Sequence, residues 1–162
     1  MSTKVWIGLD NGVSGALAFL SDDGVRTHLM PGIKTGKRTL IDVQRLKMLL
    51  SEVEGIACIY IEKTKLNPAF GAKGNHGSGI SAGRVTATLD LMQVPYVEIE
   101  PKAWQKAIGI ATAPDKKLAV MHWVRMRFPG IGAEAWKRGD GRADALALAW
   151  YCRQKEGLPV SS

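Results

Sequence analysis

The residues best suited to chemistry in this chain are four carboxylates. Asp10 and Glu62 each end a run of aliphatic residues that is typical of a buried strand. Asp140 and Asp144 open an apolar stretch with the composition of a buried helix. Two strand ends and one helix start can bring their carboxylates together, and clustered carboxylates repel one another unless a divalent cation compensates. The pattern therefore predicts metal-assisted chemistry.

Each carboxylate also has a purely structural explanation. Asp10 could begin a turn, Glu62 could pair with a following lysine, and Asp140 could cap the last helix. Asp144 has the fewest alternatives, because the helix that it opens is nearly all apolar and should face other protein. Asp140 and Asp144 are four residues apart, so on a helix both project from one face.

The charge balance favours a nucleic-acid partner. Lys and Arg number 22 against 15 Asp and Glu, a formal net charge of +7. If four acids share one site, the remaining surface is more basic than this net charge suggests. The length of 162 residues, with 46% hydrophobic and 23% charged residues, suits one folded domain over residues 1–162. An acidic centre in a basic chain indicates chemistry on a phosphate polyanion.

Apolar runs and turn residues predict the elements that position these carboxylates. We expect strands at residues 5–10, 16–20, 25–30, 56–62 and 94–99. We expect helices at residues 39–53, 80–92, 101–107, 115–128 and 141–155, with a basic loop at 31–38 and a glycine-rich loop at 63–79. The strand at 56–62 follows a helix and should run parallel to the first strand. This order predicts an α/β protein with the ribonuclease H-like fold, a mixed five-stranded sheet flanked by helices.

The two cysteines and the N-terminal residues indicate the cellular compartment in which the protein is expected. Cys58 lies in an expected buried strand and Cys152 in the last expected helix, so we expect two free thiols, with a disulfide between them as the alternative. Free cysteines are typical of a reducing compartment. The chain shows no signal-peptide pattern and no apolar run of membrane-spanning length. We therefore expect a cytoplasmic protein, in a bacterium or a phage-infected bacterial cell, with no membrane partner.

Four sets of residues resemble, in the same order, the motifs of the RuvC-type Holliday junction resolvases, also called crossover junction endodeoxyribonucleases. They read IGLDNGVSGA at 7–16, IEK at 61–63 followed by the glycine loop and SAGR at 81–84, PKAWQK at 101–106 with DKK at 115–117, and GDGRADAL at 139–146. The resemblance covers nearly the whole chain. The last motif is most similar to phage-like members of the family.

This resemblance implies a homodimeric endonuclease that nicks two opposed strands of a four-way DNA junction. Asp10, Glu62 and Asp144 match the metal ligands of the family. Asp140 matches less cleanly, because many members place an acid where this chain has Gly141. The expected mechanism uses two Mg²⁺ ions, for which Mn²⁺ could substitute, and no small-molecule cofactor. The products would carry a 5′ phosphate and a 3′ hydroxyl.

The resemblance and the basic residues also supply a set of expected DNA contacts. Lys116 falls on a family position near the scissile phosphate and is counted with the catalytic residues. Many members carry an aromatic wedge after the second acid, and Phe70 is the candidate here, with core packing as its alternative. The helix at 80–92 is the expected dimer interface. The expected DNA-binding residues are Lys63, Lys65, Phe70, Lys73, Arg84, Lys102, Lys106, Lys116 and Lys117.

Three other functions fit part of the pattern. Sugar kinases and other actin-like ATPases share the Asp-x-Gly-x-x-Gly spacing of residues 10–15, but they require two such domains. A module that binds branched nucleic acid without cutting would not need all four acids. A nuclease of the same fold could act on an RNA–DNA hybrid or a flap, and the sequence leaves that choice of substrate open, together with any preferred cleavage sequence.

Overall fold

A mixed five-stranded sheet forms the centre of the protein, as the sequence predicts. The computed structural model describes residues 3–156. The strand order is β3-β2-β1-β6-β7, with β1 antiparallel to β2 and parallel to β6. The strands are β1 (Val5–Asp10), β2 (Ala16–Ser21), β3 (Gly24–Leu29), β6 (Ile56–Glu62) and β7 (Tyr96–Ile99).

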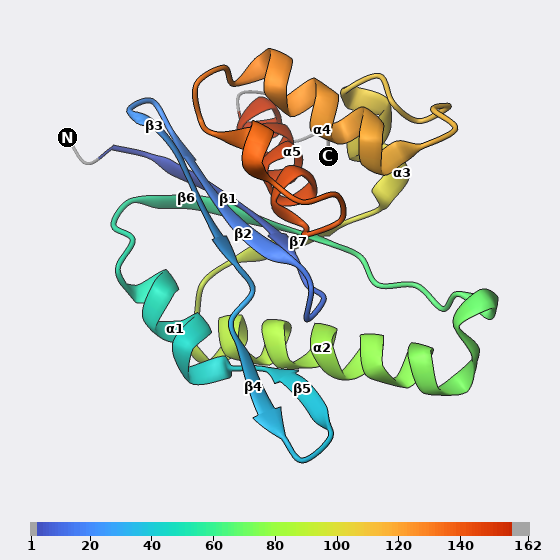
Figure 1. The fold of residues 1–162 in the computed structure, drawn as a ribbon. Helices are drawn as coiled ribbons and strands as arrows, with labels where there is room; N and C mark the ends of the chain where they lie inside the picture. The colour runs from blue at the N-terminus through green and yellow to red at the C-terminus, as the bar shows by residue number, and fades with distance from the viewer. Residues whose placement is uncertain (1–2, 157–162) are drawn as a thin grey trace, which may run out of the picture.

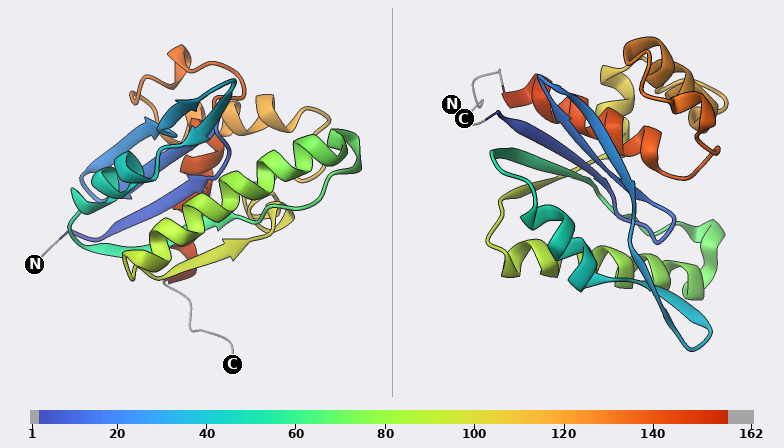
Figure 2. Two further views of the ribbon diagram at one scale, coloured as in Figure 1. Left: turned by 90° about the horizontal axis from the view of Figure 1, so that it is seen from below. Right: turned by 60° about the vertical axis from the view of Figure 1, so that its left-hand side comes forward.

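Helices cover both faces of this sheet (Figure 1, Figure 2). One face packs against α5 (Arg142–Glu156), with α3 (Pro101–Ala107) and α4 (Lys116–Arg127) beyond it. The other face packs against α1 (Val43–Ser51) and α2 (Gly71–Leu91). Each face therefore has its own apolar core, and β1 is buried between the two.

Helix α5 packs closely on β1. Gly8 makes it possible, since a Cβ at Gly8 would overlap the carbonyl oxygen of Ala145 and lie 2.5 Å from the backbone nitrogen of Ala149. A side chain there would push the helix off the strand. This contact places the first turn of α5 directly beside the C-terminal end of β1.

The expected basic loop at 31–38 is wrong, because this segment forms most of a hairpin of β4 (Gly32–Thr35) and β5 (Arg38–Ile41). Gly36 has φ +60° at the first position of the two-residue turn, a conformation that favours glycine. Strand β5 includes residues 39–41, which were expected at the start of the next helix. Helix α1 therefore begins at Val43, where the Asp42 side chain caps it by accepting from Arg45 N.

The expected glycine-rich loop at 63–79 is also wrong over its second half. After the short turn η1 (Pro68–Phe70), α2 begins at Gly71 and contains five glycines. Asn75 anchors its first turn: its side-chain Oδ1 accepts from Asn67 N at 2.8 Å, and its Nδ2 donates to the carbonyl oxygens of Asn67 and Gly71. Glycine has a low helix propensity, so the sequence pattern did not predict a helix here. The side-chain hydrogen bonds of Asn75 stabilise this first turn of α2.

The expectation of two free thiols is wrong as well. Strand β6 lies beside β1, on which α5 packs, so Cys58 and Cys152 meet across the core and form a disulfide. The inference of a reducing compartment from free cysteines therefore loses its basis. No helix within residues 3–156 is long and apolar enough to cross a bilayer.

Candidate active site

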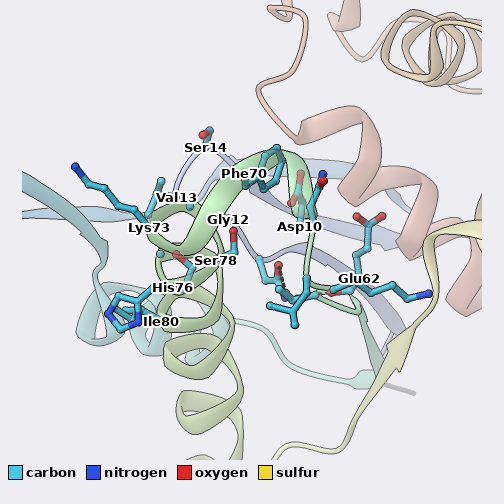
Figure 3. Close-up of a pocket in the computed structure, with 18 of the residues that line it drawn as sticks. Asp10, Gly12, Val13, Ser14, Glu62, Phe70, Lys73, His76, Ser78 and Ile80 are labelled. Atoms are coloured by element: carbon cyan, nitrogen blue, oxygen red, sulfur yellow. Dashed lines mark hydrogen bonds between the residues drawn. The ribbon is translucent and has the colours of Figure 1, made fainter.

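Three of the four predicted carboxylates come from elements that meet at one edge of the sheet. Asp10 and Glu62 end β1 and β6, which pair in parallel with Leu9 opposite Ile61, so both carboxylates leave the sheet at the same end. Asp144 lies in the first turn of α5, against β1, and is 8% exposed. Figure 3 shows Asp10 and Glu62 projecting to the same side.

The pKa values of Asp10 and Glu62 reflect their burial and the charges around them. Burial raises the pKa of Asp10 to about 6, with repulsion from Asp144 as the next cause. Burial also raises the pKa of Glu62 to about 7, and repulsion from Asp10 and Asp144 adds to it. A hydrogen bond from Trp104 opposes that rise. Negative charge at this place is therefore incompletely compensated.

Lys117 supplies the positive charge that the site has. Its Nζ donates to Asp144 Oδ2. Burial would lower the pKa of Lys117, but Asp144, Asp10 and Glu62 together raise it. One ammonium facing three carboxylates leaves an excess of negative charge. Within residues 3–156, no three His, Cys, Asp or Glu side chains form a ready-made metal-binding group.

The two neighbouring lysines of α4 thus lie in different surroundings. Lys116, which the resemblance places near the scissile phosphate, is exposed and in no ion pair within the described residues. Lys117, expected only to bind DNA, touches the carboxylate cluster. Helix α4 begins as expected, capped by the Asp115 side chain, which accepts from Leu118 N at 3.0 Å.

Trp104 is a site residue that the sequence analysis missed. Its indole Nε1 donates to Glu62 Oε2 at 2.8 Å, and its side chain is 2% exposed in the core below the site. Asn11 Nδ2 donates to the main-chain oxygen of Glu62 at 3.1 Å. Pro101 predicted the start of α3. No sequence pattern indicated that the indole of Trp104 reaches Glu62.

Asp140 lies at the start of α5 in a different environment. Burial would raise its pKa, but hydrogen bonds from Arg142 lower it. Its Oδ1 accepts from Arg142 N at 3.1 Å, and its Oδ2 accepts from Lys137 N at 3.2 Å and from Arg142 Nε at 3.0 Å. Asp140 is not among the charges that shift the pKa of Asp10 or Glu62.

Gly141 separates Asp140 from the cluster. Its φ is +81°, and a Cβ there would lie 2.8 Å from Asp10 Oδ2 and 2.7 Å from Gly15 Cα. No side chain fits at this position. An acid at this position, three residues before Asp144, is therefore sterically incompatible with this backbone.

An open groove of about 820 Å³ lies beside Asp10 and Glu62 (Figure 3). Its walls are the segment from Glu62 to Phe70, the N-terminal half of α2 and strand β5. Leu66 is 84% exposed and Phe70 is 60% exposed, which contradicts core packing as the role of Phe70. The cations in the lining are Arg38, Lys63, Lys65 and Lys73.

The structure distributes the other expected DNA contacts around this groove. Lys63 and Lys65 both pair with Glu100, the former at 3.4 Å, rather than with Glu62. Arg84 Nε donates to the carbonyl oxygen of Ile41 at 2.7 Å, at the base of the β4–β5 hairpin. Lys102 and Lys106 are exposed on α3, outside the groove lining.

Comparison with solved structures supports the fold. Thermus thermophilus RuvC in complex with a Holliday junction substrate has a TM-score of 0.60 at 18% identity, over 93% of this chain and 96% of that one. Another Thermus thermophilus RuvC structure gives 0.56 at 19% identity with the same coverage. The yeast mitochondrial Holliday junction resolvase Ydc2 gives 0.50 at 14% identity, over 92% of this chain and 85% of that one.

At these identities the likeness is one of fold, and it confirms the predicted ribonuclease H-like architecture. No protein-family profile and no curated protein sequence matches the chain.

Proposed function

We propose that this chain is a metal-dependent endodeoxyribonuclease that resolves four-way DNA junctions by symmetric nicking. The observation that carries the proposal is the meeting of Asp10, Glu62 and Asp144 beside a groove lined with cations. The fold supports the proposal, because the structure of a protein with this architecture was determined in complex with a Holliday junction substrate. We expect nicks with a 5′ phosphate and a 3′ hydroxyl.

The chemistry of the three carboxylates suits a divalent metal. Carboxylate oxygens are the ligands that Mg²⁺ and Mn²⁺ prefer. The raised pKa values of Asp10 and Glu62 indicate negative charge that a cation would compensate. Asp10, Glu62 and Asp144 would hold the metal, and two ions are proposed. When bound, the metal would lower the pKa of an attacking water and neutralise charge on the phosphate.

Other residues would orient the site and the substrate. Trp104 holds one oxygen of Glu62 and restricts its orientation. Lys117 lies against Asp144 and could turn its ammonium to a DNA phosphate when that carboxylate has another partner. The exposed Lys102, Lys106 and Lys116 would bind phosphates farther along the strand, in the salt-dependent manner of backbone contacts.

The test is cleavage of a defined set of nucleic acids. A synthetic four-way junction, a linear duplex, a flap and an RNA–DNA hybrid are each incubated with Mg²⁺, Mn²⁺ or EDTA. We expect paired, ligatable nicks in the junction with either metal and none with EDTA. Asp10→Asn should bind the junction without cutting it. Binding without cleavage by the unaltered protein would identify a junction-binding module, and faster cleavage of the hybrid would change the substrate class.

A further inference from the structure

The β4–β5 hairpin contributes little to the core of the protein and projects beyond the sheet (Figure 1, Figure 2). Every residue from 32 to 39 is exposed. A two-stranded hairpin alone is marginally stable in water. This one is held at its base, where Asp42 N donates to the carbonyl oxygen of Pro31 at 2.8 Å and Arg84 Nε donates to that of Ile41. Of the residues in the two strands only Ile41, at the end of β5, is buried in the core, so the rest of the hairpin lies outside it.

The hairpin carries positive charge only. Residues 32–41 include Lys34, Lys37 and Arg38 and no acid. None of these three cations is in an ion pair within the part of the chain that the structure describes. Lys37 occupies the turn itself and Arg38 pairs with Thr35 beside it, so two cations lie at the tip. Uncompensated cations on a projecting element are suited to a polyanion.

The position of the hairpin connects it to the candidate site. Arg38 and Thr39 line the same groove as Asp10 and Glu62, and Lys73 of α2 lines it with them. The hairpin lies on the α1 and α2 side of the sheet, whereas α3 and α4, which carry the other exposed lysines, lie on the opposite side (Figure 1). The carboxylates therefore stand between two basic regions.

We infer that the β4–β5 hairpin is a DNA-binding arm that holds the phosphate backbone of the duplex entering the groove beside the cleaved strand. Lys34, Lys37 and Arg38 make the phosphate contacts, and Arg84 acts through the hairpin by fixing its base. The inference rests on the proposed function for the identity of the polyanion. It adds a second contact region to the lysines of α3 and α4.

The experiment compares two triple variants with the same change in charge. Lys34→Gln, Lys37→Gln and Arg38→Gln are combined in the hairpin variant. The control variant combines Arg26→Gln, Lys47→Gln and Lys155→Gln, three exposed cations outside the groove lining. Binding to a labelled four-way junction and to a linear duplex is measured by fluorescence anisotropy across a salt series. Single-turnover cleavage of the junction is measured at saturating enzyme.

In the hairpin variant the fall of log affinity with log salt should be less steep, by roughly two to three in the slope. Binding at moderate salt should weaken by roughly tenfold to a hundredfold. The control variant should show neither change. At saturating enzyme the control variant should cut at the rate of the unaltered protein, because its changes lie outside both the groove and the carboxylate cluster.

Equal salt slopes for the two triple variants would overturn the inference, even if the unaltered protein cuts junctions. A protein that binds DNA through the hairpin but cuts nothing would retain the inference and overturn the proposed function. Failure of the unaltered protein to bind either DNA would overturn both.

Discussion

At the scale of single residues, the site consists of three acids and one cation whose charges do not balance. Asp144 has Lys117 as its partner, whereas Asp10 and Glu62 are half-buried, with pKa values raised to about 6 and about 7. Such burial costs stability whenever the groups are charged. A bound cation would remove this cost in stability. We therefore assign Asp10 and Glu62 to function rather than to folding.

The stability of the metal-free protein should therefore fall as pH rises. The ordinary pKa values of Asp10 and Glu62 are 3.8 and 4.5, so between these and the raised values the folded state binds more protons than the unfolded state. The free energy of unfolding then decreases from about pH 4 to about pH 7. Urea unfolding in EDTA at about pH 5.5 and about pH 8 measures the decrease.

Glu62→Gln is the matched control for that measurement, since it removes one titrating group and keeps the acceptor for Trp104. It should show a smaller loss of stability over the same interval. Equal stability of the unaltered protein at both pH values would contradict the assignment of uncompensated carboxylates.

Asp140, just before α5, and Asp144, in its first turn, should respond differently to replacement. Asp144→Asn should abolish cleavage, because this carboxylate faces Asp10 and Glu62. Asp140→Asn should cost on the order of 1 kcal/mol of stability, because an amide replaces the carboxylate that accepts from Arg142 and Lys137. It should retain most activity, because Asp140 is not among the charges that shift the pKa of Asp10 or Glu62. Nicking rate and melting temperature on both variants separate the roles. An inactive but stable Asp140→Asn would place Asp140 at the metal.

The neighbouring lysines of α4 offer a similarly matched pair. Lys117→Ala should slow single-turnover cleavage far more than Lys116→Ala, because only Lys117 touches the carboxylate cluster. Both changes should weaken DNA binding mildly, each lowering the salt slope by about one. If Lys116→Ala slowed cleavage and Lys117→Ala did not, the result would instead support a place for Lys116 near the scissile phosphate, as the resemblance implies.

At the scale of the elements, two glycines with opposite surroundings test how the site is built. Gly8→Ala should destabilise the protein by about 1–3 kcal/mol or more, because its Cβ would collide with the backbone of α5 and displace Asp144. Gly79→Ala should stabilise it by about 0.5–1 kcal/mol, because a Cβ on this exposed position of α2 meets nothing. Urea unfolding measures both, and a neutral Gly8→Ala would refute the close contact.

At the scale of the whole molecule, a four-way junction offers two equivalent strands, which a two-fold dimer could cut together. Gly83, Ala87 and Leu91 follow one another at four-residue spacing along α2, and all are exposed, Leu91 by 87%. Small residues with one large apolar residue permit close helix contact. We therefore predict a homodimer in solution through this face of α2.

Light scattering on the unaltered protein should give the mass of two chains. Gly83→Arg should give one chain that still unfolds cooperatively, because a side chain at Gly83 meets nothing within the protomer. A single-chain mass for the unaltered protein, both free and bound to a junction, would contradict the predicted dimer.

Much of the fold could be predicted from local patterns. The strands at Val5–Asp10 and Ile56–Glu62 have continuous apolar runs, and helix α4 begins at a capping aspartate, so sequence neighbours alone specify them. Two such strands, when parallel and adjacent, must end at the same edge of the sheet, which is why the sequence alone predicts that Asp10 and Glu62 lie together. The four-residue spacing of Asp140 and Asp144 predicted one helix face, but not which of them reaches the cluster.

Tertiary packing decided the rest, because contacts between distant residues leave no local pattern. The start of α2 depends on bonds between Asn67 and Asn75 that outweigh the low helix propensity of glycine. The disulfide depends on where α5 crosses β6, and the indole bond to Glu62 depends on where α3 packs. Lys117 rather than Lys116 meets Asp144 because adjacent residues on a helix point about 100° apart, so the docking angle of α4 selects one of them.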